Sequence, residues 1–112
     1  MYQRIDKINA LLRQEISLIV AQEISDPRVS FTISVVNVET SRDLGLARVY
    51  VTDLGGAEHK MHAIEGLNSA SNFIRRLLRK KINLKKIPAL EFLDDNSIEE
   101  GALLSKKIDE LF

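Results

Sequence analysis

Apolar residues change their spacing along this chain, and the change restricts it to a fold that mixes helices with strands. The first apolar residues recur at steps of three and four, which predicts a helix with one buried stripe. They are Ile5, Ile8, Leu12, Ile16 and Ile19. The pattern ends near Glu23, and Asp26-Pro27 then stops the helix because proline disfavours helical geometry in the residue before it.

Two runs of β-branched residues follow this helix. The first extends from Phe31 to Glu39, and in the second Ala47, Val49 and Val51 alternate with more polar residues. A polar loop from Thr40 to Gly45 joins the two runs. Such runs with a short polar connection predict an antiparallel pair of strands.

Helical spacing returns after Gly55-Gly56 and continues from about Lys60 to Ile82. This second helical pattern has a weak point at residues 68–72, where four side chains compete for backbone hydrogen bonds. They are Asn68, Ser69, Ser71 and Asn72. We therefore expect a kink or a break in the helix at this point.

The last part of the chain adds one strand and one helix. A short strand is expected at Ala89 to Leu93, directly after Pro88. Ser97 and Glu100 have the spacing of a capping box, which predicts a final helix with an apolar stripe of Leu104, Ile108 and Leu111. The predicted order is α-β-β-α-β-α, with a kink in the middle helix, in a single α+β domain of residues 1–112.

Length and composition agree with one domain and exclude several classes of protein. A chain of 112 residues with 45% hydrophobic content can bury a core without metal or disulfide support. It has no cysteine, which excludes a disulfide framework, thiol catalysis and cysteine-based zinc sites. The opening residues, Met1 to Ala10, lack an uninterrupted apolar core, so we expect no signal peptide or membrane span and a cytoplasmic protein.

Charge is concentrated in one segment of a chain that is neutral as a whole, with 16 basic and 16 acidic side chains. Residues 66–90 carry seven basic side chains and no acidic one, namely Arg75, Arg76, Arg79, Lys80, Lys81, Lys85 and Lys86. Residues 91–112 carry two basic and seven acidic side chains. The concentration of positive charge predicts a partner that carries phosphates.

A helical projection gathers the positive charge on one side of the middle helix. At 100° per residue, one arc of about 140° contains Asn68, Ser69, Asn72, Arg75, Arg76, Arg79 and Lys80. The other side contains Ile64, Leu67, Ala70, Phe73, Ile74, Leu77, Leu78 and Ile82. A helix that restarts at the break would also present its amino-terminal N–H groups to a phosphate. The alternative is an ordinary solvated face, which the complete lack of acidic neighbours disfavours.

Other residues with catalytic or ligand chemistry do not form a recognisable site. His59 and His62 are three residues apart but have no evident third metal ligand, so solvent exposure explains them better. The acidic residues near position 95 are explained by helix capping. No Trp is present, and only four Phe and two Tyr, which favours recognition of phosphates over stacking on bases.

Several motifs resemble one family of RNA-binding proteins. A short α-β-β-α-α-β chain with a broken helix pair is similar to the type II KH fold, although the Gly-x-x-Gly loop of that fold is absent here. The order of the motifs is similar to bacterial ribosome-binding factor A. These motifs are Asp26-Pro27-Arg28-Val29, Ser41-Arg42-Asp43-Leu44, Ala47-Arg48-Val49-Tyr50-Val51, Asn68-Ser69-Ala70, Phe73-Ile74-Arg75-Arg76, Ile87-Pro88-Ala89-Leu90-Glu91-Phe92 and Asp95-Asn96-Ser97-Ile98-Glu99-Glu100-Gly101.

The resemblance implies a ribosome assembly factor without catalytic activity. It implies binding to the immature 30S small ribosomal subunit through 16S ribosomal RNA, and assistance in late maturation, including processing of the RNA 5′ end. It implies no cofactor, no metal and no small-molecule substrate, and we expect a monomer. The alternative is a protein-interaction adaptor whose basic helix face docks onto an acidic protein.

The basic segment and the resemblance together indicate which residues contact RNA. The family has an interhelical Ala-x-Gly kink, which corresponds to Ala70-Ser71-Asn72 here, with asparagine at the glycine position. Asparagine tolerates left-handed geometry, so Asn72 can preserve the kink; the alternative is a straighter or capped junction in which residue 72 is helical. The expected RNA-binding residues are Asn68, Ser69, Ala70, Ser71, Asn72, Arg75, Arg76, Arg79, Lys80, Lys81, Lys85 and Lys86, with additional contacts from Arg28 and Arg42.

Overall fold

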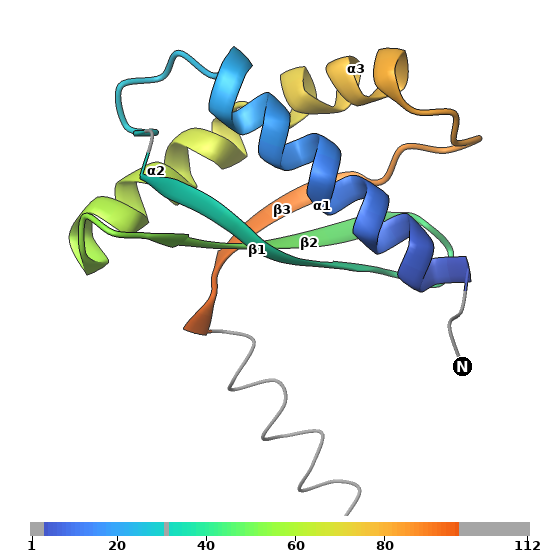
Figure 1. Ribbon diagram of the computed structural model, residues 1–112, viewed down its shortest axis with the longest axis horizontal. Coiled ribbons are helices and arrows are strands. Elements are labelled where there is room, and N and C mark those ends of the chain that lie inside the picture. The colour runs from blue at the N-terminus through green and yellow to red at the C-terminus, as the bar shows by residue number, and fades with distance from the viewer. Residues whose placement is uncertain (1–3, 31, 97–112) are drawn as a thin grey trace, which may run out of the picture.

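Three helices lie on one face of a three-stranded sheet (Figure 1). The computed structural model describes residues 4–30 and 32–96. Within them the order is α-β-β-α-α-β, which confirms the α+β arrangement expected of a type II KH fold. The final helix predicted from Ser97 onward lies outside the described residues.

Helix α1, Arg4–Glu23, confirms the first predicted helix and covers the sheet with its apolar stripe. Its buried side chains are Ile8, Leu12, Ile16, Ile19 and Val20. Leu12, Ile16 and Ile19 are fully buried, so this stripe forms one side of the core. Burial of each such side chain stabilises the fold by about 1.5 to 3 kcal/mol.

The sheet has the strand order β1-β2-β3. Strand β1, Ile33–Thr40, pairs antiparallel with β2, Leu46–Asp53, as predicted. Strand β3, Ala89–Asp94, lies parallel to β2 and forms an edge of the sheet. Val49 and Phe92 are register partners that both point into the core under the helices. The pairing of β1 with β2 shifts register between Val35 and Asn37, which is a β-bulge.

The predicted middle helix is two helices. Helix α2, Ala57–Ser69, begins three residues before the predicted start at Lys60, and α3, Ser71–Lys81, follows after a break at Ala70. Leu67 of α2 and the α3 residues Ile74 and Leu78 are fully buried against the sheet. The break is therefore confirmed.

Of the two backbone conformations left open for Asn72, the structure has the helical one. Asn72 is inside α3, and Leu44 is the one non-glycine residue with a positive φ in the described ranges. The break occurs instead at Ala70, whose φ of −91° and ψ of 1° are accessible to any L-residue. A left-handed residue is thus unnecessary for this kink.

Candidate functional site

The junction between α2 and α3 keeps most of its backbone hydrogen bonds. The Ala70 N–H is shared between the carbonyl oxygens of Gly66 and Leu67, both at 3.1 Å. The Ala70 carbonyl in turn accepts the N–H of Ile74 at 2.9 Å. No side chain caps the start of α3. The predicted residues Ser71 and Asn72 form its first turn, where Ser71 is half-buried and Asn72 is exposed.

The turn after α1 packs against the last turns of α2. A Cβ atom on Gly66 would lie 2.9 Å from Val29 Cγ2 and 3.3 Å from Arg28 Cβ, so glycine permits this close approach. The Arg28 guanidinium also lies 3.5 Å from the Ser69 hydroxyl. The structure therefore brings Arg28 to the interhelical junction, 41 residues away in sequence.

The charge of Arg28 is offset by a neighbouring carboxylate. Its Nη2 lies 2.7 Å from Asp26 Oδ2, and its Nε donates to Asp26 Oδ1 at 3.1 Å. These hydrogen bonds from Arg28 lower the pKa of Asp26 to about 2, and the same contact raises the pKa of Arg28. As a pair they add no net charge to the junction, so Arg28 contributes less to phosphate attraction than an unpaired arginine.

Asn68 contacts the edge strand of the sheet. Its Nδ2 donates to the Phe92 carbonyl at 3.1 Å, and its Oδ1 accepts the Phe92 N–H at 2.8 Å. Because β3 is an edge strand, these two bonds satisfy backbone groups that no further strand pairs. Asn68 thus has a structural contact that its position in the predicted basic arc did not indicate.

Arg75 was predicted to belong to the exposed basic arc, but its side chain is half-buried. Its Nη2 donates to the Ile87 carbonyl at 2.9 Å, which fastens the α3–β3 loop to α3. Its Nε is buried without a hydrogen-bond partner in the described structure. This guanidinium therefore positions the loop, and only part of its surface is available to a ligand.

The remaining predicted cations form what we call the basic surface. It consists of Arg76, Arg79, Lys80 and Lys81 on α3 and Lys85 and Lys86 in the following loop, all of them exposed. Within residues 4–30 and 32–96, none of these six side chains forms a salt bridge. Hydrogen bonds from Ser41 and Gly45, and the charge of Lys86, lower the pKa of Asp43 in the β1–β2 turn. Because none of its six cations forms a salt bridge among the described residues, the basic surface is positive, with Asp43 as an acidic neighbour of Lys86.

One aromatic residue lies within the basic surface, which the helical projection did not predict. Phe73 was placed on the apolar side, but it is 38% exposed, and the Arg76 guanidinium carbon is 5.8 Å from its ring centre. Together with Leu77, Arg79 and Lys80, these two residues line a shallow hollow of about 480 Å³. The projection divides the helix into a basic side and an apolar side. The fully buried residues of α3, Ile74 and Leu78, form a stripe that is narrower than the apolar side, so Phe73 lies at its exposed margin.

Arg42 lies apart from the α2–α3 junction, in the turn between β1 and β2. This turn, the start of α1 and the α3–β3 loop lie at the same end of the molecule (Figure 1). A hydrogen bond of 3.0 Å from the Ala89 N–H to the Gly45 carbonyl connects the turn to the end of that loop. Arg42 is exposed, and it borders a hollow next to Arg4, a residue that the sequence did not single out.

The two histidines lie at the opposite end, near the start of α2. His59 Nδ1 is 2.6 Å from Oδ2 of Asp53, while His62 is exposed. Nearby, Lys60 forms salt bridges with Asp94 and Asp95 at 2.9 and 3.0 Å. In the described part of the chain, no three or more His, Cys, Asp or Glu residues are grouped as a metal site.

A helix that spans a membrane must be both long and apolar. None of the helices in the described ranges meets both conditions.

Comparison with known proteins identifies the family. Residues 4–111 match the family described as Ribosome-binding factor A. The chain is 43% identical to Ribosome-binding factor A of Acetivibrio thermocellus over 108 residues, which cover 96% of this chain and 88% of the relative. It is 45% identical to Ribosome-binding factor A of Agathobacter rectalis over 105 residues, which cover 94% of this chain and 87% of that relative. The similarity therefore does not depend on one relative.

Solved structures agree with this result. The crystal structure of ribosome-binding factor A from Thermus thermophilus is 26% identical, with a TM-score of 0.73 over 84% of this chain and 99% of that one. A homology model of the Thermus thermophilus protein, fitted into a cryo-EM map of its 30S complex, is 28% identical and has a TM-score of 0.63. It covers 76% of this chain and 88% of that one. The chain therefore belongs to the ribosome-binding factor A family.

Proposed function

We propose that this protein binds the immature 30S small ribosomal subunit through 16S ribosomal RNA and assists late maturation of the subunit, including processing of the RNA 5′ end. The observation that carries the proposal is the basic surface, six exposed cations without a salt bridge in the described structure. Membership of a family whose relative was fitted into a 30S complex supports the choice of partner.

The basic surface would bind RNA mainly through phosphates. Each lysine or arginine that neutralises a phosphate releases counterions, which favours binding at low salt. Arginine contacts phosphate with two parallel donors, so Arg76 and Arg79 would also orient the RNA. The adjacent α2–α3 junction would add Ser69, Ala70, Ser71 and Asn72 to the contact, with α3 pointing its uncapped start toward the backbone of the RNA.

The protein would act by binding alone, as a single copy in the cytoplasm, without a cofactor, a metal or a small-molecule substrate. Arg28, Arg42, Asn68 and Arg75 would have secondary roles in this interface. Arg28 is paired with Asp26, while Asn68 and Arg75 hold β3 and the α3–β3 loop in place. Their substitution is therefore expected to act on the shape of the site as well as on its charge.

The test is binding to purified 16S ribosomal RNA over a range of salt concentrations. If about four phosphates are neutralised, the logarithm of affinity should fall with the logarithm of salt with a slope of about −3 to −4. The double variant Arg79→Glu, Lys80→Glu should abolish binding and remain folded, because both side chains are exposed; its melting temperature should fall slightly, because acidic side chains in the last turn of α3 oppose the helix dipole. The single reversal Arg79→Glu should weaken binding, and Arg13→Glu, the same change of charge at an exposed position on α1, is its matched control and should bind normally.

Two results would contradict the proposal. An affinity that does not depend on salt would exclude phosphate contacts as its basis. Binding to ribosomal proteins but not to protein-free RNA would instead identify an adaptor whose basic surface docks onto an acidic protein. Footprinting of the protein on immature small subunits would then locate the contact.

A further inference from the structure

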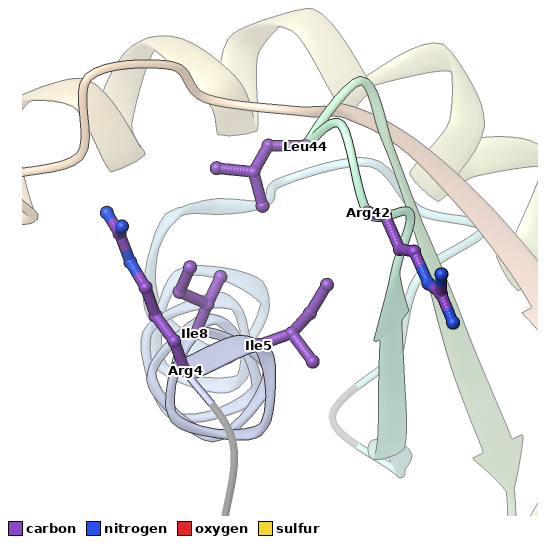
Figure 2. A pocket seen from close by; sticks show the side chains of 5 residues that line it. All are labelled: Arg4, Ile5, Ile8, Arg42 and Leu44. Atoms are coloured by element: carbon purple, nitrogen blue, oxygen red, sulfur yellow. The ribbon is translucent and has the colours of Figure 1, made fainter.

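A hollow lies between the start of α1 and the β1–β2 turn, outside the α2–α3 junction (Figure 2). Its volume is about 350 Å³, which is within the range of small-ligand sites. Ile5, Ile8 and Leu44 form its apolar walls, and Arg4 and Arg42 complete the lining. Figure 2 shows the apolar side chains between the two arginines, with the Arg4 guanidinium on one side of them and the Arg42 guanidinium on the other, directed away from them.

The turn that provides Leu44 is held in a costly conformation. Leu44 has a φ of 60°, in the left-handed region that bulky L-residues avoid. Its N–H donates to the Ser41 carbonyl at 2.9 Å, and Asp43 Oδ1 accepts the Gly45 N–H at 2.9 Å. The hydrogen bonds fix the turn, so the leucine side chain stays over the hollow. Backbone strain of this kind is concentrated at functional sites.

The two arginines and the apolar walls of the hollow together favour a ligand that has both a negative charge and a flat apolar surface. Arg4 and Arg42 are exposed, and neither forms a salt bridge in the part of the chain that the structure describes. The nearest acidic residue of the turn, Asp43, is occupied by Ser41 and Gly45. Phosphate alone would gain nothing from the apolar walls, and an apolar peptide would leave both guanidinium groups without a partner.

We propose that this hollow binds one unpaired nucleotide of the RNA held by the basic surface. The base would pack on Ile5, Ile8 and Leu44, and the two arginines would contact the phosphates on either side of it. Unstacked bases in single-stranded loops and bulges are the parts of RNA that proteins read in this way. A base inside a continuous duplex could not enter the hollow.

The proposal rests on the proposed function, because the hollow adjoins the basic surface. Lys86 belongs to that surface, and its charge helps to lower the pKa of Asp43. Asp43 is in the same turn as Arg42 and Leu44. The Ala89 N–H bonded to Gly45 holds this turn against the end of the α3–β3 loop. One RNA could therefore contact α3 with its paired part and place an unpaired nucleotide in the hollow.

The test compares two RNA hairpins with the same stem, of which one has a single unpaired nucleotide. The wild-type protein should prefer the bulged hairpin by about tenfold. Leu44→Asn should lose this preference and keep its affinity for the fully paired hairpin, since asparagine accepts left-handed geometry but provides no apolar wall. Arg4→Gln and Arg42→Gln should each reduce the salt slope for the bulged hairpin by about one.

The matched control is Arg13→Gln, which removes the same charge from the same helix. The helical repeat puts Arg13 on the side of α1 opposite Arg4, so the preference and both slopes should be unchanged. Methyl resonances of the wild-type protein provide a direct readout that needs no variant. Addition of the bulged hairpin should shift Ile5, Ile8 and Leu44 through the ring current of the base, but not Leu54, which is 89% exposed beyond the far end of β2.

The possible outcomes distinguish failure of the nucleotide site from failure of RNA binding by the basic surface. Equal binding of both hairpins, with no methyl shift at Leu44, would overturn the nucleotide site and leave RNA binding by the basic surface intact. Failure of the wild type to bind either hairpin or 16S ribosomal RNA would overturn both. Methyl shifts caused by ribosomal proteins but not by RNA would identify the hollow as a protein-docking site and would also overturn the proposal.

Discussion

At the scale of single residues, the structure separates side chains that hold the fold from side chains that are available to a partner. Asn68 and Arg75 both belong to the predicted basic arc, but their polar groups bond to Phe92 and Ile87. Arg79 and Lys80, on the same helix face, have no salt bridge among the described residues. A helical projection gives direction only, so it could not distinguish these roles.

Substitutions at Asn72 test the helical conformation of this residue. Because Asn72 is helical, its variants should follow helix propensity, in which alanine exceeds asparagine and valine, and glycine is the weakest. Asn72→Ala should exceed Asn72→Gly in stability by roughly 1 kcal/mol, which is about 4 °C in melting temperature for a domain of this size. Thermal melting curves of the alanine, valine and glycine variants provide the measurement. A glycine variant more stable than the valine variant would restore left-handed geometry at this position.

The lowered pKa of Asp53 predicts that the stability of the protein depends on pH. Burial raises the pKa of this carboxyl group, but hydrogen bonds from Thr32 at 2.5 Å, the Gly55 N–H at 2.9 Å and His59 at 2.6 Å outweigh it, and the pKa is lowered. The folded-state pKa is therefore below the unfolded value of about 3.9. The stabilisation is present above that value and is lost as the pH falls through the folded-state pKa.

The Asp53→Asn variant should show the consequence. It should melt at a lower temperature than the wild type at pH 7, and the difference should shrink as the pH is lowered from about 5 to 2. Melting curves at each pH provide the measurement, with circular dichroism at pH 7 as the check that the variant is folded. A constant difference across this range would mean that ionisation of Asp53 does not contribute.

At the scale of helices and strands, apolar periodicity predicted most of the fold. It located α1 within a residue or two and both strands of the antiparallel pair, because each buries one stripe or face. The cluster of Asn and Ser predicted the break in the middle helix. It could not give the exact residue, since the shared hydrogen bond at Ala70 ends α2 without special backbone geometry.

The sequence pattern could not predict the contacts between helices and strands. The parallel pairing of β3 with β2 and the bulge near Val35 depend on how the helices pack, and local spacing does not encode that packing. The hollow at Leu44 required both a left-handed leucine and the nearby start of α1. The sequence identified the turn as a polar loop from Thr40 to Gly45, and the motif Ser41-Arg42-Asp43-Leu44 matched the family, but neither indicated the conformation of Leu44.

The bond between Asn68 and β3 gives a prediction at this scale. Asn68→Ala would remove both partners of Phe92 on the edge strand, and each lost bond to a buried backbone group costs about 1 to 3 kcal/mol when water does not replace it. We expect lower stability and faster hydrogen exchange of the Phe92 amide. Ser69→Ala is the control, because its hydroxyl donates to the Glu65 carbonyl on an exposed helix face. Equal exchange rates in the two variants would contradict the role of Asn68.

At the scale of the whole molecule, the position of charge should matter more than its total. The chain is formally neutral, so attraction to RNA depends on the segregation of positive charge onto one surface. The acidic residues within 97–112 lie outside the described structure. Within the described residues, neither α3 nor the loop that follows it contains an acidic side chain, and Asp43 of the β1–β2 turn is close enough to Lys86 for the two charges to interact. The start of α2, with its exposed Glu58, lies at the other end of the molecule from that loop (Figure 1).

A pair of substitutions separates the position of charge from net charge. Arg79→Gln lowers the net charge by one, and Glu58→Gln raises it by one, so the double variant is formally neutral again. Because screening limits charge effects to about 8 to 10 Å at physiological salt, we expect the double variant to bind 16S ribosomal RNA as weakly as Arg79→Gln alone. Its salt slope should likewise be smaller than that of the wild type by about one, and Glu58→Gln alone should bind as the wild type does. Recovery of wild-type affinity in the double variant would show that the RNA responds to net charge, and the basic surface would then lose its role as a defined site.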